Sequence, residues 1–229
     1  MAKHARMRRL IAADFAPGTP PATLADDEIH VWLSAGRQGA AAGAFVDGLL
    51  AAYLGTEPSQ IAVDRDSHGK PYLVRPLGSL QFNLSHSGRH LIVAISRSPS
   101  LGVDIETASR TRPWLALAQR YFTPAEHATL TALPEGDLAA AFLALWSCKE
   151  AVVKALGRGI AFGLHRLGFG WAADGSLDRL VEIDIEAGRP DEWNVVQVFP
   201  ARGVTGALAW RGPDRRLRAF MAPEAVTGL

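Results

Sequence analysis

The spacing of apolar and polar positions along the first half of the chain predicts strands around one helix. Residues 28–34 alternate between apolar and polar side chains, as a half-buried strand does. Residues 38–54 are rich in alanine and leucine and are expected to form a helix that ends at Gly55. Further strands are expected at 80–84, 91–96 and 102–105.

Other parts of this half carry turn or irregular patterns. Residues 64–71 combine aspartate, serine, glycine and proline, which is typical of a turn. Residues 1–27 are expected to be irregular because Pro17, Pro20 and Pro21 oppose helix formation there.

The second half shows a similar order of patterns. One helix is expected from about Pro124 and a longer one over 137–156, with Asp137 as the N-cap and Gly157 as the stop. Four strands are then expected, at 180–185, 193–199, 204–210 and 217–221.

The order of elements predicts an α+β fold of two similar α/β halves. Each half would be a small, mainly antiparallel sheet packed with a long helix, and the order suggests a pseudo-two-fold duplication. We expect the halves to comprise residues 1–101 and 102–229, although no repeat is visible residue by residue and no low-complexity linker separates them.

Composition narrows the class of protein. With 48% apolar residues among 229 and a net charge of +1, the chain reads as a folded globular protein without a general affinity for nucleic acid. The one cysteine, Cys148, excludes an intramolecular disulfide or a cysteine-based zinc cluster and fits a reducing compartment. No apolar stretch is long enough to span a bilayer, so we expect a cytoplasmic protein without membrane contact.

The first chemical signature is Gly102-Val103-Asp104-Ile105-Glu106. On a strand, Asp104 and Glu106 project from one face while Val103 and Ile105 point to the other. Two neighbouring carboxylates raise each other's pKa unless a cation compensates them, and Mg²⁺ is a suitable cation. The alternative is a strand end that enters solvent, where both acids are free.

The second signature lies on the long helix. Trp146, Glu150 and Lys154 are four residues apart in turn and therefore share a face. Glutamate followed by lysine at this spacing is often only a surface ion pair. However, apolar neighbours surround these residues in the sequence, which also allows a partly buried functional pair.

Two further segments could bind an anion. Residues 83–88 (Asn-Leu-Ser-His-Ser-Gly) follow a strand, and hydroxyl groups, an imidazole and loop N–H groups suit phosphate. The alternative is a Ser-Gly turn capped by His86. In residues 68–71, Gly69 allows close approach of a ligand and Lys70 could meet a phosphate, or Lys70 is merely an exposed turn lysine.

Five motifs in order turn these separate signals into a resemblance. They are His68-Gly-Lys-Pro, Phe82-Asn-Leu-Ser-His-Ser, Gly102-Val-Asp-Ile-Glu, Phe122-Thr-Pro-Ala-Glu126 and Trp146-Ser-Cys-Lys-Glu-Ala-x-x-Lys-Ala-x-Gly157. The chain thus resembles the 4′-phosphopantetheinyl transferase superfamily, in particular its single-chain, Sfp-type class of pseudo-dimers. The motifs cover about residues 28–170.

The resemblance implies transfer of the phosphopantetheine arm of coenzyme A to a serine of an apo acyl or peptidyl carrier protein, with adenosine 3′,5′-bisphosphate as the other product. Asp104, Glu106 and Glu150 would hold Mg²⁺, with Mn²⁺ as an alternative. Glu150 and Lys154 would be catalytic, Glu150 as the acceptor of the serine proton and Lys154 as a phosphate partner. A monomer would suffice for the site.

Coenzyme A would be bound by Lys70, Ser85, His86, Lys154 and Arg37. Within the family, the helix before the Gly-Lys-Pro turn usually carries basic residues, whereas residues 38–54 carry none and Arg37 is the nearby cation. Local basic residues are candidate docking contacts for an acidic carrier, namely Arg110, Arg112 and Arg120.

Two rival functions stay open. A metal-dependent phosphodiesterase could use the same acids with water as the nucleophile, and a non-catalytic coenzyme A-binding module could keep the fold. The sequence leaves undecided whether the carrier serves fatty acid, polyketide or nonribosomal peptide synthesis.

Overall fold

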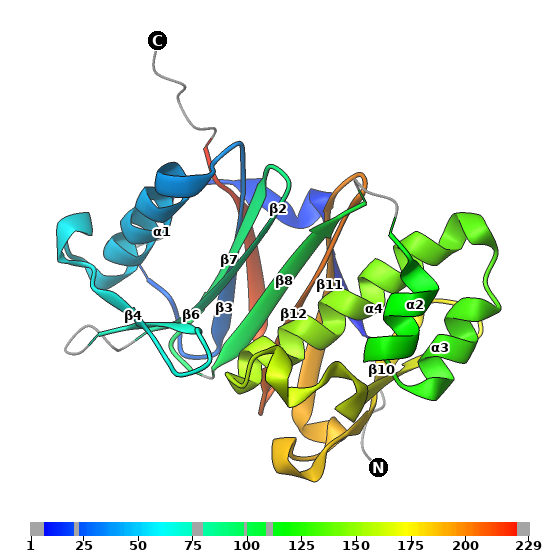
Figure 1. Ribbon diagram of the computed structural model, residues 1–229. Helices are drawn as coiled ribbons and strands as arrows, with labels where there is room; N and C mark the ends of the chain where they lie inside the picture. Colours follow the sequence, from blue (N-terminus) through cyan, green and yellow to red (C-terminus); the bar gives the residue numbers. More distant parts are fainter. Residues whose placement is uncertain (1–6, 21–22, 75–79, 99, 109–111, 224–229) are drawn as a thin grey trace.

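The protein is described by a computed structural model, which covers residues 7–20, 23–74, 80–98, 100–108 and 112–223. Two β-sheets face each other in the middle of the molecule. The helix α1 (Gly39–Leu54) lies on the outer side of one sheet, and α4 (Glu135–Leu156) lies on the outer side of the other (Figure 1). No helix in these described ranges is both long and apolar enough to cross a membrane.

The first sheet has five strands in the order β2-β13-β3-β7-β6. Their bounds are Phe15–Pro17, Arg216–Met221, Glu28–Ala35, His90–Ser96 and Gln81–Ser87. The strands β3, β7 and β6 pair antiparallel, whereas β13 is parallel to both of its neighbours. Apolar side chains of α1 pack on the outer face of this sheet, among them Leu49 and Leu50.

The second sheet has four strands in the order β1-β11-β12-β8. Their bounds are Arg8–Ile11, Trp193–Ala201, Val204–Arg211 and Leu101–Thr107. The helix α4 packs on its outer face, against Ala207 and Ala209 of β12. Between the two sheets lies an apolar layer that includes Val103 and Ile105, so the predicted inward direction of these two side chains is confirmed.

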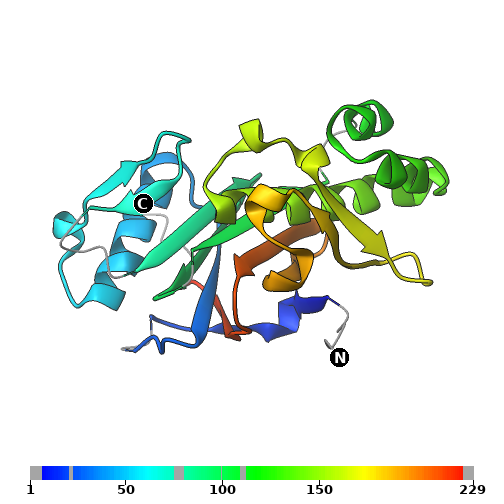
Figure 2. The ribbon, with the colours of Figure 1, turned by 90° about the horizontal axis from the view of Figure 1, so that it is seen from below.

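Smaller elements complete the fold. The helices α2 (Trp114–Tyr121) and α3 (Pro124–Thr131) gather beside α4, away from α1 (Figure 2). Two hairpins are formed by β4 (Val63–Arg65) with β5 (Pro71–Leu73) and by β9 (Leu167–Trp171) with β10 (Leu177–Ile183). Short 3₁₀ turns occupy Ala12–Asp14, Pro58–Gln60, Ile160–Phe162, Leu164–Arg166, Ile185–Ala187 and Pro190–Glu192.

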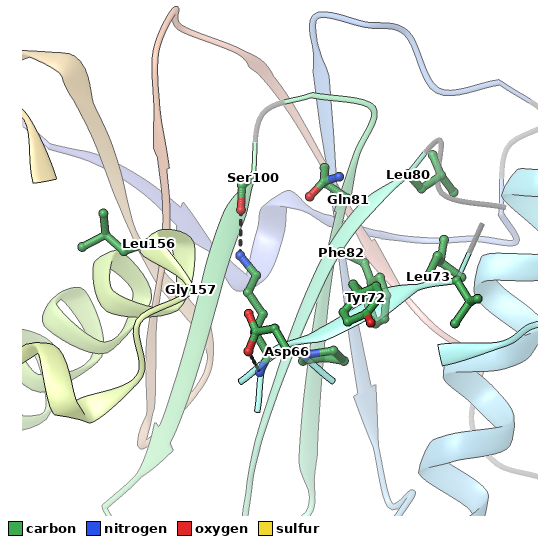
Figure 3. A pocket seen from close by; sticks show the side chains of 12 residues that line it. Asp66, Tyr72, Leu73, Leu80, Gln81, Phe82, Ser100, Leu156 and Gly157 are labelled. Atoms are coloured by element: carbon green, nitrogen blue, oxygen red, sulfur yellow. Dashed lines mark hydrogen bonds between the residues drawn. The ribbon is translucent and has the colours of Figure 1, made fainter. Parts of the chain in front are cut away.

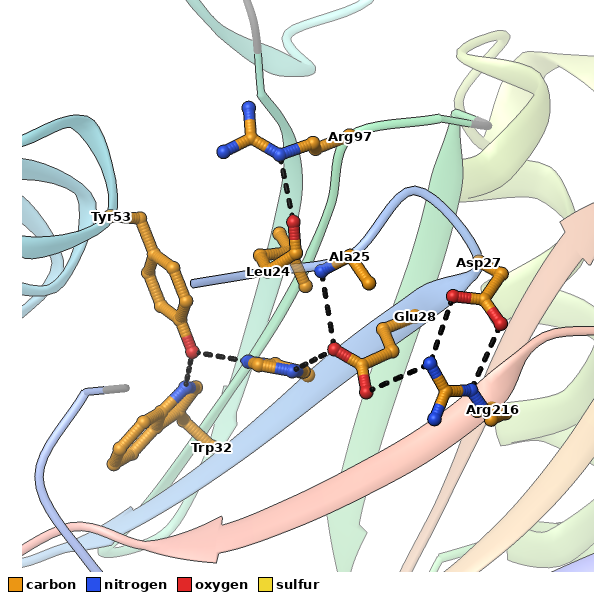
Figure 4. Close-up of polar contacts among 9 residues, drawn as sticks. Leu24, Ala25, Asp27, Glu28, Trp32, Tyr53, Arg97 and Arg216 are labelled. Atoms are coloured by element: carbon orange, nitrogen blue, oxygen red, sulfur yellow. Dashed lines mark hydrogen bonds and ion pairs between the residues drawn. The ribbon is translucent and has the colours of Figure 1, made fainter. Parts of the chain in front are cut away.

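The strands near the two ends of the chain cross between the halves. The early strand β1 pairs with β11 of the second sheet, and the late strand β13 pairs with β3 of the first. Arg216 connects β13 to the start of β3, because its guanidinium donates to both carboxylate oxygens of Asp27, at 2.9 and 3.0 Å (Figure 4). A buried chain of hydrogen bonds continues from Glu28 through His30 to Tyr53 of α1.

Most of the predicted elements are confirmed, and the α+β class is correct. Both long helices end at the predicted glycines, Gly55 and Gly157, each in the left-handed conformation at φ 65° and φ 70°.

Two predictions about elements are wrong. Asp137 is not an N-cap, because α4 already begins at Glu135 after Pro134, which fixes the start of the helix. Residues 1–27 are not irregular throughout, since they contain β1 and β2. The predicted turn at 64–71 is confirmed, and it joins the short strands β4 and β5.

Candidate active site

Asp104 stands at the centre of the site, where β8 meets both α4 and β6. Its side chain is buried, with 5% of the residue exposed. One carboxylate oxygen, Oδ1, accepts hydrogen bonds from Lys154 Nζ at 2.7 Å and from Ser85 Oγ at 2.9 Å. The other oxygen, Oδ2, is buried and has no hydrogen-bond partner among the described residues. Asp104 therefore joins the two predicted halves and keeps one oxygen available for a ligand.

Gly102 allows α4 to lie directly on β8. A Cβ atom at this position would come within 2.1 Å of the Ala151 carbonyl oxygen and 2.4 Å of the Ala155 nitrogen. Only glycine permits such contact with a helix backbone. Because of this close approach, Lys154 reaches across to Asp104 and to the Val103 carbonyl, the latter at 3.1 Å.

Glu150 lies on the same helix, one turn before Lys154. It is buried, and its Oε1 has no hydrogen-bond partner in the described structure. Burial, reinforced by the negative charge of Asp104, raises the pKa of the Glu150 carboxyl to about 7. This carboxyl can therefore take up and release a proton near neutral pH.

Glu106 is half-buried and completes the group of three acids. Its Oε2 accepts a hydrogen bond from Ser87 Oγ at 3.2 Å. Burial and the neighbouring Asp104 raise the pKa of Glu106, while the exposed Arg112 acts in the opposite direction. Asp104 raises the pKa of both Glu106 and Glu150, so the three carboxyl groups lie in one electrostatic neighbourhood.

The strand β6 contributes a row of polar side chains to this site. Asn83 Oδ1 accepts the Val103 N–H at 2.9 Å, and Ser87 Oγ accepts the Thr107 N–H at 3.1 Å. With Ser85, these side chains bridge two edge strands that share no ladder of backbone hydrogen bonds.

The expected loop at 83–88 is wrong, because residues up to Ser87 belong to β6 and their backbone pairs with β7. Ser85 is buried beside Asp104, whereas its neighbour His86 is exposed. Successive side chains of a strand point to opposite faces, so His86 does not share the face that carries Ser85.

Lys70 lies in the turn between β4 and β5, and its side chain reaches the first residue of β8. This is the opposite end of that strand from Glu106. Its ammonium donates to Ser100 Oγ at 2.7 Å and to the carbonyl oxygens of Leu101 and Ala155 at 3.1 and 3.4 Å. Burial lowers the pKa of Lys70 to about 8. Lys70 is thus not a free turn lysine, since it ties the turn to β8 and to the C-terminal end of α4.

A pocket opens beside Lys70 (Figure 3). Its volume is about 460 Å³, and its lining combines apolar groups, including Tyr72, Phe82 and Leu156, with Asp66 and Gln81. Such a mixture of apolar walls and a few polar groups is typical of small-molecule sites.

Arg37 lies between the end of β3 and the start of α1. Its guanidinium donates to Ser34 Oγ and to the Pro223 carbonyl oxygen, the latter at 2.8 Å, and it covers the ring of Phe45. The structure therefore brings Ser85, Asp104, Glu106, Glu150 and Lys154 together, while Lys70, His86 and Arg37 lie around this group.

Several residues of the site were not assigned to it from the sequence. Asn83 and Ser87 could have been found from the period-two polar pattern Asn83-x-Ser85-x-Ser87, once that segment was recognised as a strand. No local pattern indicates that Arg112 lies near Glu106 or that Gly102 contacts α4.

Two carboxylate oxygens of this site are of the type that binds a divalent cation. Two buried oxygens, Asp104 Oδ2 and Glu150 Oε1, lack donors, and buried oxygens of this kind normally have a partner. Within the described residues the side chains do not form a preassembled cluster of three ligands. In their present positions Lys154 neutralises Asp104 instead.

Comparisons with known proteins agree with the geometry. The model of the family described as "4′-phosphopantetheinyl transferase superfamily" matches residues 100–205. A second family model, "4′-phosphopantetheinyl transferase, N-terminal", matches residues 38–98. The chain is 33% identical over 178 residues to 4′-phosphopantetheinyl transferase HetI of Nostoc sp., a match covering 63% of this chain and 75% of that protein.

Two Bacillus proteins match over shorter stretches. The chain is 41% identical over 105 residues to 4′-phosphopantetheinyl transferase psf-1 of Bacillus pumilus, with 46% of this chain and 43% of the relative covered. It is 34% identical over 122 residues to 4′-phosphopantetheinyl transferase Sfp of Bacillus subtilis, with 53% and 52% covered. The chain thus spans about half the length of these two relatives.

Proposed function

We propose how this chain, which belongs to the 4′-phosphopantetheinyl transferase superfamily, moves the 4′-phosphopantetheine arm of coenzyme A to a carrier-protein serine. The chain is an enzyme of this kind, a holo-[carrier protein] synthase. The serine oxygen bonds to the phosphorus that carries the pantetheine arm, and the bond from that phosphorus to adenosine 3′,5′-bisphosphate breaks. The observation that carries the proposal is the convergence of Asp104, Glu106, Glu150 and Lys154 between β8 and α4.

The three acids are the proposed ligands of Mg²⁺ or Mn²⁺. Asp104 and Glu150 each offer a buried oxygen without a donor, and Glu106 lies beside them on β8. Oxygen ligands of this type suit both ions. A bound ion would neutralise phosphate charge and favour departure of the nucleotide.

Glu150 is the proposed acceptor of the serine proton. A general base works best when its pKa lies near the working pH, and in the metal-free site burial raises the pKa of the Glu150 carboxyl to about 7. Lys154, on the same face of α4, would leave Asp104 and bind the phosphates, and its charge would stabilise the leaving group.

Coenzyme A is expected to extend along β8. Lys154 and Ser85 lie near the middle of this strand, and Lys70 and its pocket lie at one end. The turn after His86 lies at the other end, where Ser87 contacts Thr107. We propose that Lys70, Ser85, His86 and Arg37 contact this long substrate, with the diphosphate next to Lys154.

The KM values for coenzyme A and for 3′-dephospho-coenzyme A test which residue contacts the 3′-phosphate of the ribose. The substitution His86→Ala should raise the KM for coenzyme A and remove the preference for it over the dephospho form. A preserved preference would take His86 out of this role, and the same comparison applies to Arg37→Ala.

Carrier docking is assigned to exposed basic side chains, one of which, Arg112, acts on the charge of Glu106. Arg112 and Arg120 are exposed, and the charge of Arg112 reaches Glu106, whereas Arg110 lies outside the described residues. Charge reversal at Arg112 or Arg120 should raise the KM for an acidic carrier and leave the KM for coenzyme A unchanged. An unchanged KM for the carrier would discard this surface.

The two halves are proposed to derive from a duplication. Within each half, a strand and a long helix are followed by a hairpin whose second strand pairs antiparallel with the first strand: β3-α1-β6-β7 and β8-α4-β11-β12. One chain supplies all the proposed ligands, which supports a monomeric enzyme.

The activity is tested by incubating the protein with coenzyme A, Mg²⁺ and several apo carrier proteins, followed by intact-mass measurement. The expected result is a carrier whose mass has increased by one phosphopantetheine group. Hydrolysis of coenzyme A without a carrier would favour a phosphodiesterase, and binding without turnover would favour a non-catalytic module.

A further inference from the structure

A buried ion pair lies directly beside Glu150. Lys149 of α4 has none of its surface exposed, and its Nζ lies 2.7 Å from Oε2 of Glu126 on α3, which is 2% exposed. The ammonium also donates to the carbonyl oxygens of Leu164, at 3.0 Å, and of Leu167. All three ammonium hydrogens therefore have an acceptor.

Glu126 is as fully engaged as its partner. Its Oε2 also accepts the N–H of Thr123 at the start of α3, at 2.9 Å, and its Oε1 accepts the N–H of Phe169 in β9, at 2.8 Å. The pair thus connects α3, α4, the turn at Leu164–Arg166 and β9 through directional hydrogen bonds.

Such a pair adds little net stability and mainly fixes the relative orientation of the segments that it joins. Removing two charges from water costs free energy that their attraction only partly returns, so an apolar pair of equal volume can be equally stable. Hydrogen bonds from α4 to three other segments nevertheless allow α4 only one rotation about its axis. A pair of this kind fixes orientation.

Glu150 depends on that orientation because its own contacts do not hold it. Its Oε1 has no hydrogen-bond partner among the described residues. Adjacent residues on an α-helix point about 100° apart, so the direction of Lys149 determines the direction of Glu150. With Lys149 anchored toward α3 and β9, Glu150 faces the carboxylates of β8.

We propose that the Lys149–Glu126 pair is a positioning device for Glu150 and for the neighbouring Lys154. This inference rests on the proposed catalytic role of Glu150. Neither member of the pair touches the substrate. The pair acts by setting the rotation of α4 and therefore the distance between Glu150 and the acids of β8.

The test uses substitutions that keep side-chain volume: Lys149→Met, Glu126→Gln and the double variant. Each is assayed for kcat, for the KM of coenzyme A and of an apo carrier, for Tm, and for hydrogen exchange of α4. Each single variant should lose stability because it leaves one buried charge or donor unpaired. The double variant carries no uncompensated charge and should recover much of this Tm loss.

The double variant decides the question because stability and turnover should separate there. We expect its kcat to be about 10- to 100-fold below wild type, with the KM for coenzyme A unchanged and faster exchange in α4, since a small misplacement of a catalytic group costs about this much. A double variant with recovered Tm and wild-type kcat would overturn the positioning role.

Leu145→Ala is the matched control. Leu145 is fully buried on the same helix but belongs to no polar network, so its truncation lowers Tm while leaving kcat near wild type. If Leu145→Ala lowers kcat as much as the double variant does, general loosening of α4 explains the effect and the inference fails.

If the double variant does not fold, Glu126→Gln alone is measured well below its Tm, and the same kcat criterion applies to it. Wild-type protein that fails to modify any carrier would contradict the proposed function itself. Active wild-type protein with an equally active double variant would contradict only the positioning inference.

Discussion

At Glu150, burial and the charge of Asp104 act in the same direction, so the carboxyl holds its proton up to near-neutral pH. Asp104 is treated differently by its surroundings, because Lys154 and Ser85 both donate to its Oδ1. Glu150 is thus suited to exchange a proton, whereas Asp104 forms an ion pair with Lys154. This division of roles between two nearby carboxyl groups is what acid–base chemistry at a phosphate requires.

Replacing Glu150 by glutamine should separate catalysis from folding. The amide cannot accept the serine proton, and we expect kcat to fall by about 10²- to 10⁴-fold. The fold should persist, because a neutral amide of the same size costs less to bury than a charged carboxylate. Intact-mass kinetics and circular dichroism measure the two effects, and near wild-type turnover would remove Glu150 from catalysis.

The raised pKa of Glu150 also predicts how stability depends on pH. A pKa that is higher in the folded than in the unfolded state stabilises the fold at low pH, and this contribution is lost as pH rises from 4.5 to about 7. In metal-free buffer with a chelator, the Tm of wild type relative to Glu150→Gln should therefore fall over this window.

Buried His30 makes stability depend on pH in the opposite direction, but its effect cancels when wild type is compared with Glu150→Gln. Burial lowers its pKa, so its contribution to stability is lost as pH falls below 6.5. Because His30 is present in both proteins, the difference in Tm isolates Glu150. A constant difference across the window would contradict the raised pKa, and Mg²⁺ should weaken the trend if it binds here.

At the scale of elements, the placement of α4 on β8 depends on the absence of a side chain at Gly102. Because Gly102 has no side chain, the backbones of β8 and α4 lie in direct contact, which brings the acids of β8 close to Glu150 of α4. The element pattern itself was readable from the sequence: α1, α4 and the long strands follow clear apolar periodicities. The short strands β1, β2 and β9 were missed, because three to five residues carry too little periodicity and their pairing partners are remote.

Gly102→Ala should disturb the site without touching a ligand. The added methyl group must displace the backbone of α4, which we expect to cost about 1–3 kcal/mol or more of stability and to weaken the contact of Lys154 with Asp104. Chemical unfolding and kcat measure both consequences.

Gly43→Ala is the matched control for this substitution. Gly43 lies exposed in the interior of α1, and a Cβ there meets nothing within 4 Å. Alanine should therefore stabilise the protein by about 0.5–1 kcal/mol through helix propensity. Equal effects of the two substitutions would show that contact with α4 is unimportant at Gly102.

At the scale of the molecule, the two sheets exchange strands, because β1 joins the second sheet and β13 joins the first, and the site lies where β6 and β8 meet. The grouping of the acids was foreseeable from the order of the motifs, but this exchange was not. Strand patterns report which face is apolar and contain no information about which distant strand completes a sheet. For the same reason, the opposite faces of Ser85 and His86 became visible only once β6 was defined.

The exchange predicts that the two halves do not fold separately. Residues 1–100 lack β13, the direct neighbour of β3, and residues 101–229 lack β1, the neighbour of β11. Each fragment should unfold without a cooperative transition, whereas a mixture of the two should regain one. Calorimetry of the fragments measures this, and a cooperative transition in either one alone would contradict it.

The late position of β13 also has a consequence for protein synthesis. A ribosome releases β3 and α1 long before it has made the strand that lies beside β3 in the finished sheet. During that interval the nascent chain exposes an open sheet edge, which is a hazard for aggregation and a natural target for chaperones. The first sheet can therefore be completed only after β13 has been translated.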